Sequence, residues 1–338
     1  FAFYQSGGVL NVGSTNGVTV DTYPRFALPY PECSFTMSNG TINVSNPITT
    51  GTSITGGILI FANSSNTQVS GGNINVICPA SNTNFTITST ASFYNLNITK
   101  AGAGTSTAIL NGISFNDNTA TFARAAQPLR VFNNFTITTG NTPTFNSNTN
   151  DLTVGGNFNI QANTTFTPGT NITFNGSGAQ TWTHSGTISA AFTNIIVDKS
   201  AGTLTLAGTQ TFPNITGTTT GLSLTSGTLN DGGKTITVTG AFSNNAVHTG
   251  TGAIVYNRAN STISGNNGTF GNLTIQVSDT VSFTGSHSIT GNLRLINANS
   301  SLNIGSNTLT VLGNIFSDAT TGTVFTTAKH IITNGLRN

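Results

Sequence analysis

Large apolar residues alternate with Thr or Asn in short runs along most of the chain. Residues 57–61 (Gly-Ile-Leu-Ile-Phe), 73–77 (Asn-Ile-Asn-Val-Ile) and 84–88 (Asn-Phe-Thr-Ile-Thr) are examples. Alternation with a period of two turns one side of a strand inward and the other outward. Gly, Asn, Ser and Thr-Gly separate the runs, and no stretch of ten residues has a convincing helical stripe. The pattern therefore predicts an all-β protein made of many short strands.

Two longer phrases recur within this pattern. The first has the form Phe, any residue, Asn, apolar, any residue, apolar, and it begins at Phe93, Phe132, Phe192 and Phe270. The second has the form Leu/Ile-Thr-Val followed by a glycine-containing turn and an apolar residue, and it begins at Leu152, Ile236 and Leu309. The copies keep their order while the number of residues between them varies, which is typical of stacked structural repeats with loops of variable length.

Two architectures fit these repeats. We expect a right-handed parallel β-helix (β-solenoid) with roughly 20 residues per coil, in which each strand lies about 4.8 Å from its neighbour in the next coil. The alternative is a row of tandem β-sandwich domains of roughly 100 residues each. Very short runs, few hairpin signals and Asn positions that recur in register favour the β-helix, since stacked turns can form asparagine ladders.

Residues 1–50 differ from residues 51–338, which carry the β-solenoid repeats. Three of the five tyrosines and three of the nine prolines lie in the first 31 positions. We interpret 1–50 as an aromatic, proline-rich cap that covers an open strand edge, or as a subunit-contact region. In the second interpretation Tyr23, Phe26 and Tyr30 are the candidate contact residues, because aromatic side chains are enriched at interfaces.

The composition is unusual for its low charge. Only 5% of residues are Asp, Glu, Lys or Arg, and the net charge is +2. A net charge this low does not indicate a basic surface for binding nucleic acid. No run of 18 apolar residues is present, so the sequence predicts no membrane span. Asn-x-Ser/Thr sequons are frequent, and glycans would supply the solubility that charges do not.

The two cysteines, Cys33 and Cys78, leave two interpretations open. They could form one disulfide in an oxidising compartment, or they could be two unpaired, buried thiols. Spacing alone does not decide between them.

Candidate chemistry is sparse. The eight carboxylates are scattered, although Asp198 and Asp279 follow equivalent strands and could meet on one side of stacked coils. The sequence has no zinc spacing, no nucleophile elbow and no phosphate loop, so we expect no catalytic, metal or cofactor-binding residues. Trp182, Asp198 and Lys199 are possible glycan contacts. The competing interpretation is a packed tryptophan and a solvated turn.

Residues 302–313 (Leu-Asn-Ile-Gly-Ser-Asn-Thr-Leu-Thr-Val-Leu-Gly), residues 176–183 and the Phe-x-Asn phrase resemble repetitive regions of large secreted surface proteins and adhesins of Bacteroidota. The resemblance covers about residues 50–325. It implies an extracellular or cell-surface structural role and carries no catalytic residues over. We therefore expect a β-solenoid rod of a surface adhesin, or a filament that self-associates as a homopolymer or belongs to a larger chain. The alternative is a polysaccharide-binding or polysaccharide-cleaving β-helix, including phage-spike-like proteins, with surface glycans as partners.

Overall fold

The computed structural model describes residues 1–13, 24–45, 57–116, 121–317, 325–326 and 330–333. These residues divide into two compact units. Unit 1 comprises residues 1–172 and 183–189, and unit 2 comprises residues 173–182 and 190–338.

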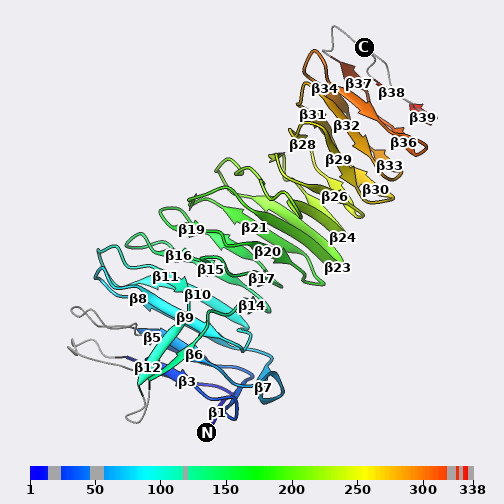
Figure 1. The fold of residues 1–338 in the computed structure, drawn as a ribbon. Helices are drawn as coiled ribbons and strands as arrows, with labels where there is room; N and C mark the ends of the chain where they lie inside the picture. Colours follow the sequence, from blue (N-terminus) through cyan, green and yellow to red (C-terminus); the bar gives the residue numbers. More distant parts are fainter. Residues whose placement is uncertain (14–23, 46–56, 117–120, 318–324, 327–329, 334–338) are drawn as a thin grey trace. The chain divides into compact units, whose positions relative to one another are not determined.

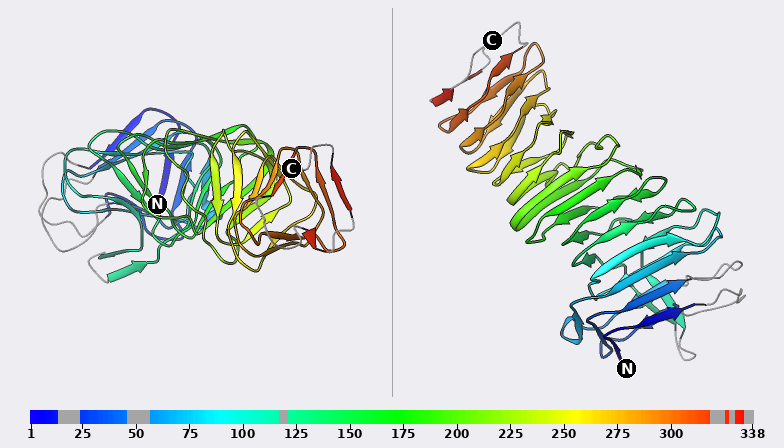
Figure 2. Two further views of the ribbon diagram at one scale, coloured as in Figure 1. Left: turned by 90° about the horizontal axis from the view of Figure 1, so that it is seen from above. Right: turned by 180° about the vertical axis from the view of Figure 1, so that it is seen from behind.

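Both units are parallel β-helices, as the alternating pattern predicted. Strands of successive turns pair in parallel and in register, so that each turn of chain lies on the one before it (Figures 1 and 2). A β-sandwich would instead be built from antiparallel pairs. Among the described residues no helix has the length and hydrophobicity needed to cross a membrane.

Three columns of stacked strands make up unit 1. The first is β1 (Ala2–Gln5), β4 (Ser34–Met37) and β7 (Thr67–Val69). The second is β2 (Val9–Val12), β5 (Thr41–Ser45), β8 (Asn73–Cys78), β10 (Asn95–Lys100), β15 (Phe135–Ile137) and β18 (Phe158–Ile160), beside the pair β14 (Leu129–Val131) and β17 (Leu152–Val154). The third is β3 (Phe26–Leu28), β6 (Gly57–Ile60), β9 (Phe85–Ser89), β11 (Ala108–Leu110), β16 (Thr144–Asn146), β19 (Thr165–Thr167) and β22 (Thr187–Ile188).

Unit 2 also has three columns. The first two begin on the long strands β23 (Asn194–Ala207) and β24 (Leu222–Asn230). One continues as β26 (Phe242–Asn244), β29 (Ser261–Ser264), β32 (Thr280–Phe283), β35 (Ser301–Asn303) and β38 (Phe325–Thr326); the other as β27 (Val247–Thr249), β30 (Gly268–Phe270), β33 (His287–Ile289), β36 (Thr308–Val311) and β39 (His330–Thr333). The third is β25 (Thr235–Val238), β28 (Ala253–Tyr256), β31 (Leu273–Ile275), β34 (Leu293–Leu295) and β37 (Ile315–Ser317). Strands β20 (Asn171–Phe174) and β21 (Gln180–His184) contain residues of both units.

The length of a turn follows from the register. In unit 2 the aligned positions are Ile254, Leu273, Leu293 and Ile315, so a turn takes close to the predicted 20 residues. In unit 1 the aligned asparagines Asn11, Asn43, Asn75 and Asn97 show that the first two turns are longer. Those two turns include residues 14–23 and 46–56, which lie outside the described part of the chain.

Apolar side chains stack on their counterparts inside the turns. In unit 1 Phe135 aligns with Phe158, and their ring centroids lie 5.2 Å apart. Phe145 aligns with Phe166 in the neighbouring column at 6.2 Å. All four rings are fully buried. Burial of aromatic area is the main stabilising term here, and ring-to-ring contacts add to it.

The asparagine of the Phe-x-Asn phrase has the same role in every copy. The Oδ1 atoms of Asn95, Asn134, Asn194 and Asn272 each accept a hydrogen bond from a backbone N–H of the following turn, at 2.8–3.1 Å. In each copy the asparagine lies where the chain bends into a strand, and a bend exposes backbone donors that the strand ladder does not satisfy. The expected asparagine ladders are therefore present. A second one runs up β2, β5 and β8 through Asn11, Asn43 and Asn75.

The β-helix begins before residue 51. Strands β1 to β5 already pair in parallel with the next turn, so the described part of residues 1–50 is not a separate cap. Phe26 lies in β3 and is buried against Phe3 and Phe35, at centroid distances of 5.0 and 6.1 Å. Among the described strands β3 pairs only with β6, and such an edge position tolerates the prolines that flank it.

An antiparallel hairpin that the sequence analysis did not predict covers this part of unit 1. Strand β12 (Ile113–Asn116) pairs with β13 (Thr121–Arg124). Its residues Ile113 and Phe115 form a core with Leu59 of β6, which faces away from the interior of the turns. The hairpin explains why every residue of β6 is buried.

The ring of Tyr30 packs edge-on against Phe122 of the hairpin, at 6.0 Å between centroids. Arg124 lies over the Phe61 ring at 4.7 Å and donates from Nε to the Pro29 carbonyl at 3.0 Å. Phe26 is thus buried within its own chain, which corrects its prediction as a subunit contact, whereas that of half-buried Tyr30 stays a prediction. Tyr23 lies outside the described residues.

Both cysteines are buried free thiols, so the second interpretation of Cys33 and Cys78 holds and the disulfide is not formed. Cys33 precedes β4 in the first column, whereas Cys78 ends β8 in the second. Burial raises the pKa of the Cys78 thiol to about 12, although nearby Lys100 opposes this shift. A thiol with so high a pKa is inert at neutral pH.

Candidate functional site

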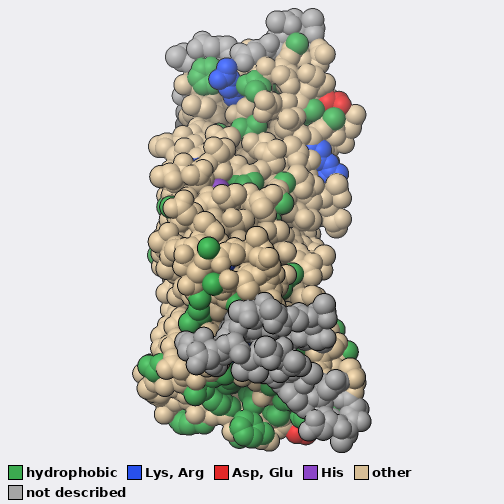
Figure 3. Space-filling view, turned by 90° about the vertical axis from the view of Figure 1, so that its left-hand side faces the viewer, with side chains coloured by type: hydrophobic (Ala, Val, Ile, Leu, Met, Phe, Trp, Pro, Cys, Tyr) green, Lys and Arg blue, Asp and Glu red, His purple; other side chains and the backbone are tan. Residues whose placement is uncertain are grey.

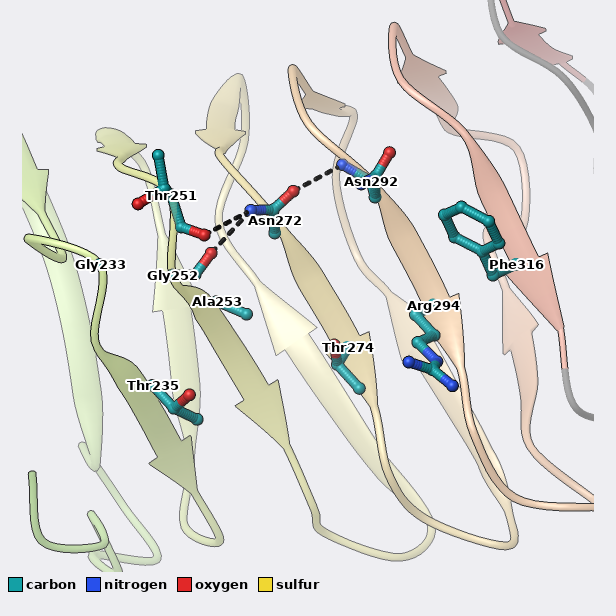
Figure 4. Close-up of a pocket in the computed structure, with 10 residues that line it drawn as sticks. All are labelled: Gly233, Thr235, Thr251, Gly252, Ala253, Asn272, Thr274, Asn292, Arg294 and Phe316. Atoms are coloured by element: carbon teal, nitrogen blue, oxygen red, sulfur yellow. Dashed lines mark hydrogen bonds between the residues drawn. The ribbon is translucent and has the colours of Figure 1, made fainter. Parts of the chain in front are cut away.

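A spacious recess lies on the outer face of the third column of unit 2. This surface, the β25–β37 groove, has a volume of about 660 Å³ and crosses all five strands (Figure 4). Its volume lies within the usual range for ligand sites, roughly 300–1,000 Å³.

The outward side chains of the groove come from two aligned columns. Thr274 of β31 aligns with Arg294 of β34, and Arg294 aligns with Phe316 of β37. Asn272 and Asn292 each precede their strand by one residue and form the second column. The period-two alternation turns these residues outward because Leu273, Ile275, Leu293 and Leu295 point into the core.

Hydrogen bonds to the backbone hold the second column in place. The Asn272 side chain donates from Nδ2 to the Gly252 carbonyl at 2.7 Å and accepts at Oδ1 from the Asn292 backbone N–H at 2.8 Å (Figure 4). The Asn292 Oδ1 accepts in turn from the Asn314 N–H at 3.0 Å. The groove is therefore preorganised along its length, which lowers the entropy cost of binding.

Charge is distributed unevenly along the groove. Arg294 is exposed near the β37 end. The other end, at Gly233 and Gly252, lies over the buried carboxylate of Asp231, whose Oδ1 accepts from both backbone N–H groups at 2.8 and 3.0 Å. The lining itself contains no Asp or Glu. Figure 3 shows how sparse charged side chains are on one face of the described residues.

Asp231 and His248 form a buried pair, and both side chains are fully inaccessible. The His248 Nε2 lies 3.0 Å from the Asp231 Oδ2. The Gly271 backbone N–H donates to the His248 Nδ1 at 3.1 Å. A backbone N–H can only donate, so Nδ1 is the acceptor and Nε2 carries the proton that it donates to Asp231.

Burial alone would raise the pKa of Asp231. The hydrogen bonds from His248, Gly233 and Gly252 outweigh that effect and hold its pKa below the ordinary value. The site also requires a glycine at position 250. Gly250 has a φ of +117°, and a Cβ there would lie 2.1 Å from the Asp231 Oδ1.

Two of the three predicted glycan contacts are corrected by the structure. Trp182 is only 1% exposed and lies in a ring cluster with Phe174, Phe192 and Phe212. Lys199 is fully buried, where its Nζ donates to the Gly176 carbonyl at 2.6 Å and to the Gln180 Oε1. Burial lowers the pKa of Lys199.

Asp198 alone of the three is exposed, and it accepts a hydrogen bond from the Ser226 hydroxyl at 2.9 Å. Period-two alternation from Ile195 and Val197 would have placed Lys199 inward and Asp198 outward. The alternation therefore indicated a buried Lys199, whereas the charge of this residue suggested a solvated turn.

Asp198 and Asp279, which could have met on one side of stacked turns, do not lie together. From β23, which holds Asp198, four pairing steps lead through β24, β26 and β29 to β32, which Asp279 immediately precedes. At about 4.8 Å per step, these two groups are separated by about 19 Å along the stack. Within the described ranges no three His, Cys, Asp or Glu side chains are placed to hold a metal ion.

A buried histidine of unit 2 predicts a pH dependence of stability. His287 lies between the rings of Phe270 and Phe283, at centroid distances of 5.6 and 5.0 Å, and burial lowers its pKa. Below about pH 6.5 the unfolded chain protonates the imidazole of His287, whereas the lowered pKa keeps it neutral to lower pH in the folded unit. We expect unit 2 to lose up to about 1.4 kcal/mol of stability per pH unit below that value.

Urea midpoints measured between about pH 7.5 and about pH 4.5 test this prediction. The loss from Asp231 enters mainly below about pH 4, where the unfolded carboxylate takes up a proton and the folded one, whose pKa is lowered, does not. The control is His287→Leu, since the aligned residue of the next turn is Leu309. This variant should lose most of the pH dependence between about pH 6.5 and about pH 4.5, and an unchanged dependence would assign the effect to another group.

Comparison of this chain with protein-family models, with curated proteins and with solved structures finds no match in any of the three.

Proposed function

We propose that this chain is a structural segment of an extracellular or cell-surface protein, an adhesin or filament in which β-solenoid turns provide a mechanically resistant scaffold. One observation carries the proposal. The asparagine of every Phe-x-Asn phrase ties its turn to the next one through a side-chain-to-backbone hydrogen bond. These bonds add to the parallel strand ladders, so a force that separates turns must break several bonds at once.

The distribution of polar groups also supports this role. The polar side chains that point outward from the turns are mostly Asn, Thr and Ser. Many form hydrogen bonds with the aligned side chain of the next turn. Thr280 and Ser301 are joined at 2.8 Å in unit 2, and Thr167 and Ser189 at 2.7 Å in unit 1. The proposal includes self-association, or continuation of the same β-solenoid in a larger chain. Antibody labelling of intact source cells would test surface exposure.

Asn95 offers a direct test, because its amide joins three turns of unit 1. Its Nδ2 donates to the Gly72 carbonyl at 3.2 Å and to the Asn73 Oδ1 at 3.0 Å. Its Oδ1 accepts from the Asn133 Nδ2 at 2.9 Å and from the Asn134 N–H at 3.1 Å. We expect Asn95→Ala to lower the stability of unit 1 by about 1–3 kcal/mol and to lower the force at which it unfolds.

The measurement is single-molecule stretching of the full chain between its ends. Asn63→Ala is the matched control, because Asn63 is exposed in the same unit and makes no side-chain cap bond. It should leave the unfolding force unchanged. A wild-type chain that unfolds as easily as a small helical domain, or an Asn95→Ala variant as resistant as the wild type, would argue against a mechanical role.

A further inference from the structure

We propose that the β25–β37 groove binds an acidic polysaccharide, laid along the stacking direction with a carboxylate-bearing sugar at Arg294. This inference is independent of the mechanical role proposed above. It concerns the outer face of the third column of unit 2, whose side chains point away from the buried core.

The lining matches the chemistry of a sugar chain. Sugars present many hydroxyls, each of which can donate and accept a hydrogen bond. The hydroxyls of Thr235 and Thr274 offer both kinds of group along the groove, and the Oδ1 atoms of Asn272 and Asn292 each keep a second lone pair as an acceptor. Phe316 is half-buried and lines the same groove, where its ring can pack against the apolar C–H groups of a sugar (Figure 4).

The length of the groove favours a polymer over a compact ligand. Five parallel strands cross it, and each next strand lies about 4.8 Å further along the stack. An extended glycan advances by a similar distance per sugar, so successive sugars meet successive turns. A small molecule would use only one or two of these turns.

Charge selects an acidic chain. The exposed guanidinium of Arg294 lies between the aligned residues Thr274 and Phe316. It can hold a carboxylate through two parallel hydrogen bonds. No carboxylate lines the groove to repel such a ligand. Asp231 lies behind the opposite end, where it is buried and receives bonds from His248, Gly233 and Gly252. A carboxylate-bearing sugar is therefore expected at Arg294.

The experiment measures binding of the full chain to polygalacturonate, with dextran sulfate, dextran and polyglutamate as comparison polymers. Polygalacturonate should bind, and its affinity should fall about tenfold or more in Arg294→Gln, because a charge-assisted pair is lost. Binding should weaken as salt is added. Dextran sulfate tests which acidic group the site accepts. A site for any acidic polysaccharide binds both polygalacturonate and dextran sulfate, whereas a site that requires a carboxylate binds polygalacturonate alone.

The matched control is Arg130→Gln. Arg130 is also exposed and lies 4.8 Å from the ring of Phe132, but it belongs to β14 of unit 1, outside the groove. This variant removes the same charge and should change the affinity less than twofold. Both exposed substitutions should leave the melting temperature unchanged. Three outcomes would each overturn the proposal: no binding of polygalacturonate, equal binding of dextran or polyglutamate, or equal loss in the two arginine variants.

Discussion

Replacing Asp231 with alanine is expected to lower the stability of unit 2 by about 3–5 kcal/mol. The carboxylate is fully buried and accepts three hydrogen bonds, from the His248 Nε2 and from the backbone N–H groups of Gly233 and Gly252. Alanine leaves all three donors without an acceptor. Each buried donor that loses its partner costs about 1–3 kcal/mol, and the imidazole cannot turn to another acceptor.

The conservative change Asp231→Asn separates the hydrogen bonds from the charge. An asparagine Oδ1 can still accept from Gly233 and Gly252, but its Nδ2 then faces the proton on the His248 Nε2. The tautomer cannot switch, because the Gly271 N–H occupies Nδ1 at 3.1 Å. We therefore expect an intermediate loss of about 1–3 kcal/mol.

Urea denaturation followed by tryptophan emission measures both variants. Trp182 is the only tryptophan and lies in unit 2, so the signal reports on the unit that holds Asp231. Asp198→Ala is the control, since that carboxylate is exposed and accepts a hydrogen bond from the Ser226 hydroxyl. It should change the stability by less than about 0.5–1 kcal/mol. If Asp231→Ala unfolded at the same urea concentration as the wild type, the Asp231–His248 pair would not stabilise the turns.

The sequence predicted the class of fold because most strands are short and alternate between buried and outward-facing residues. In β31, Leu273 and Ile275 point inward while Thr274 points outward, as a period of two requires. Stacked strands repeat this choice in every turn, so the pattern is reinforced many times over. The recurrent asparagine was equally informative, because all four copies make the same side-chain bond to the next turn.

The register between turns could not be predicted from the same pattern. The Phe-x-Asn phrases at Phe93 and Phe132 suggest that the two rings stack, yet Phe93 bridges to Val131. A shift of one residue reverses the face on which a side chain lies. Phe132 is therefore 38% exposed, whereas Phe93 is fully buried. Such shifts depend on loop geometry between strands, which alternation does not encode.

The hairpin and the groove were missed for related reasons. Strands β12 and β13 alternate like the others, but they pair with each other rather than with the next turn. The groove brings together Thr274, Arg294 and Phe316, which are separated by turns of 20 and 22 residues. Two unequal turn lengths must both be known before these residues can be placed in one column.

Replacing Trp182 with alanine is expected to destabilise unit 2 by about 3–5 kcal/mol, the other large effect that the structure predicts. The indole contacts Phe174, Phe192 and Phe212 at centroid distances of 4.8–5.2 Å, and the two T-shaped contacts with Phe192 and Phe212 are of a favourable kind. Strand ladders on either side fix the backbone around it, so the walls cannot collapse into the space that alanine leaves.

The matched control is Trp182→Phe, which keeps an aromatic ring and should cost much less, about 1–2 kcal/mol. Since both variants lack tryptophan, urea midpoints are followed by far-ultraviolet circular dichroism. In the wild type the emission should be blue-shifted and should move to the red at the same midpoint, because the indole is 1% exposed. Had Trp182 been the exposed sugar contact that sequence reasoning allowed, alanine would cost almost nothing and the emission would be red from the start. A small loss in Trp182→Ala together with red emission would therefore contradict the buried ring cluster and return Trp182 to the surface.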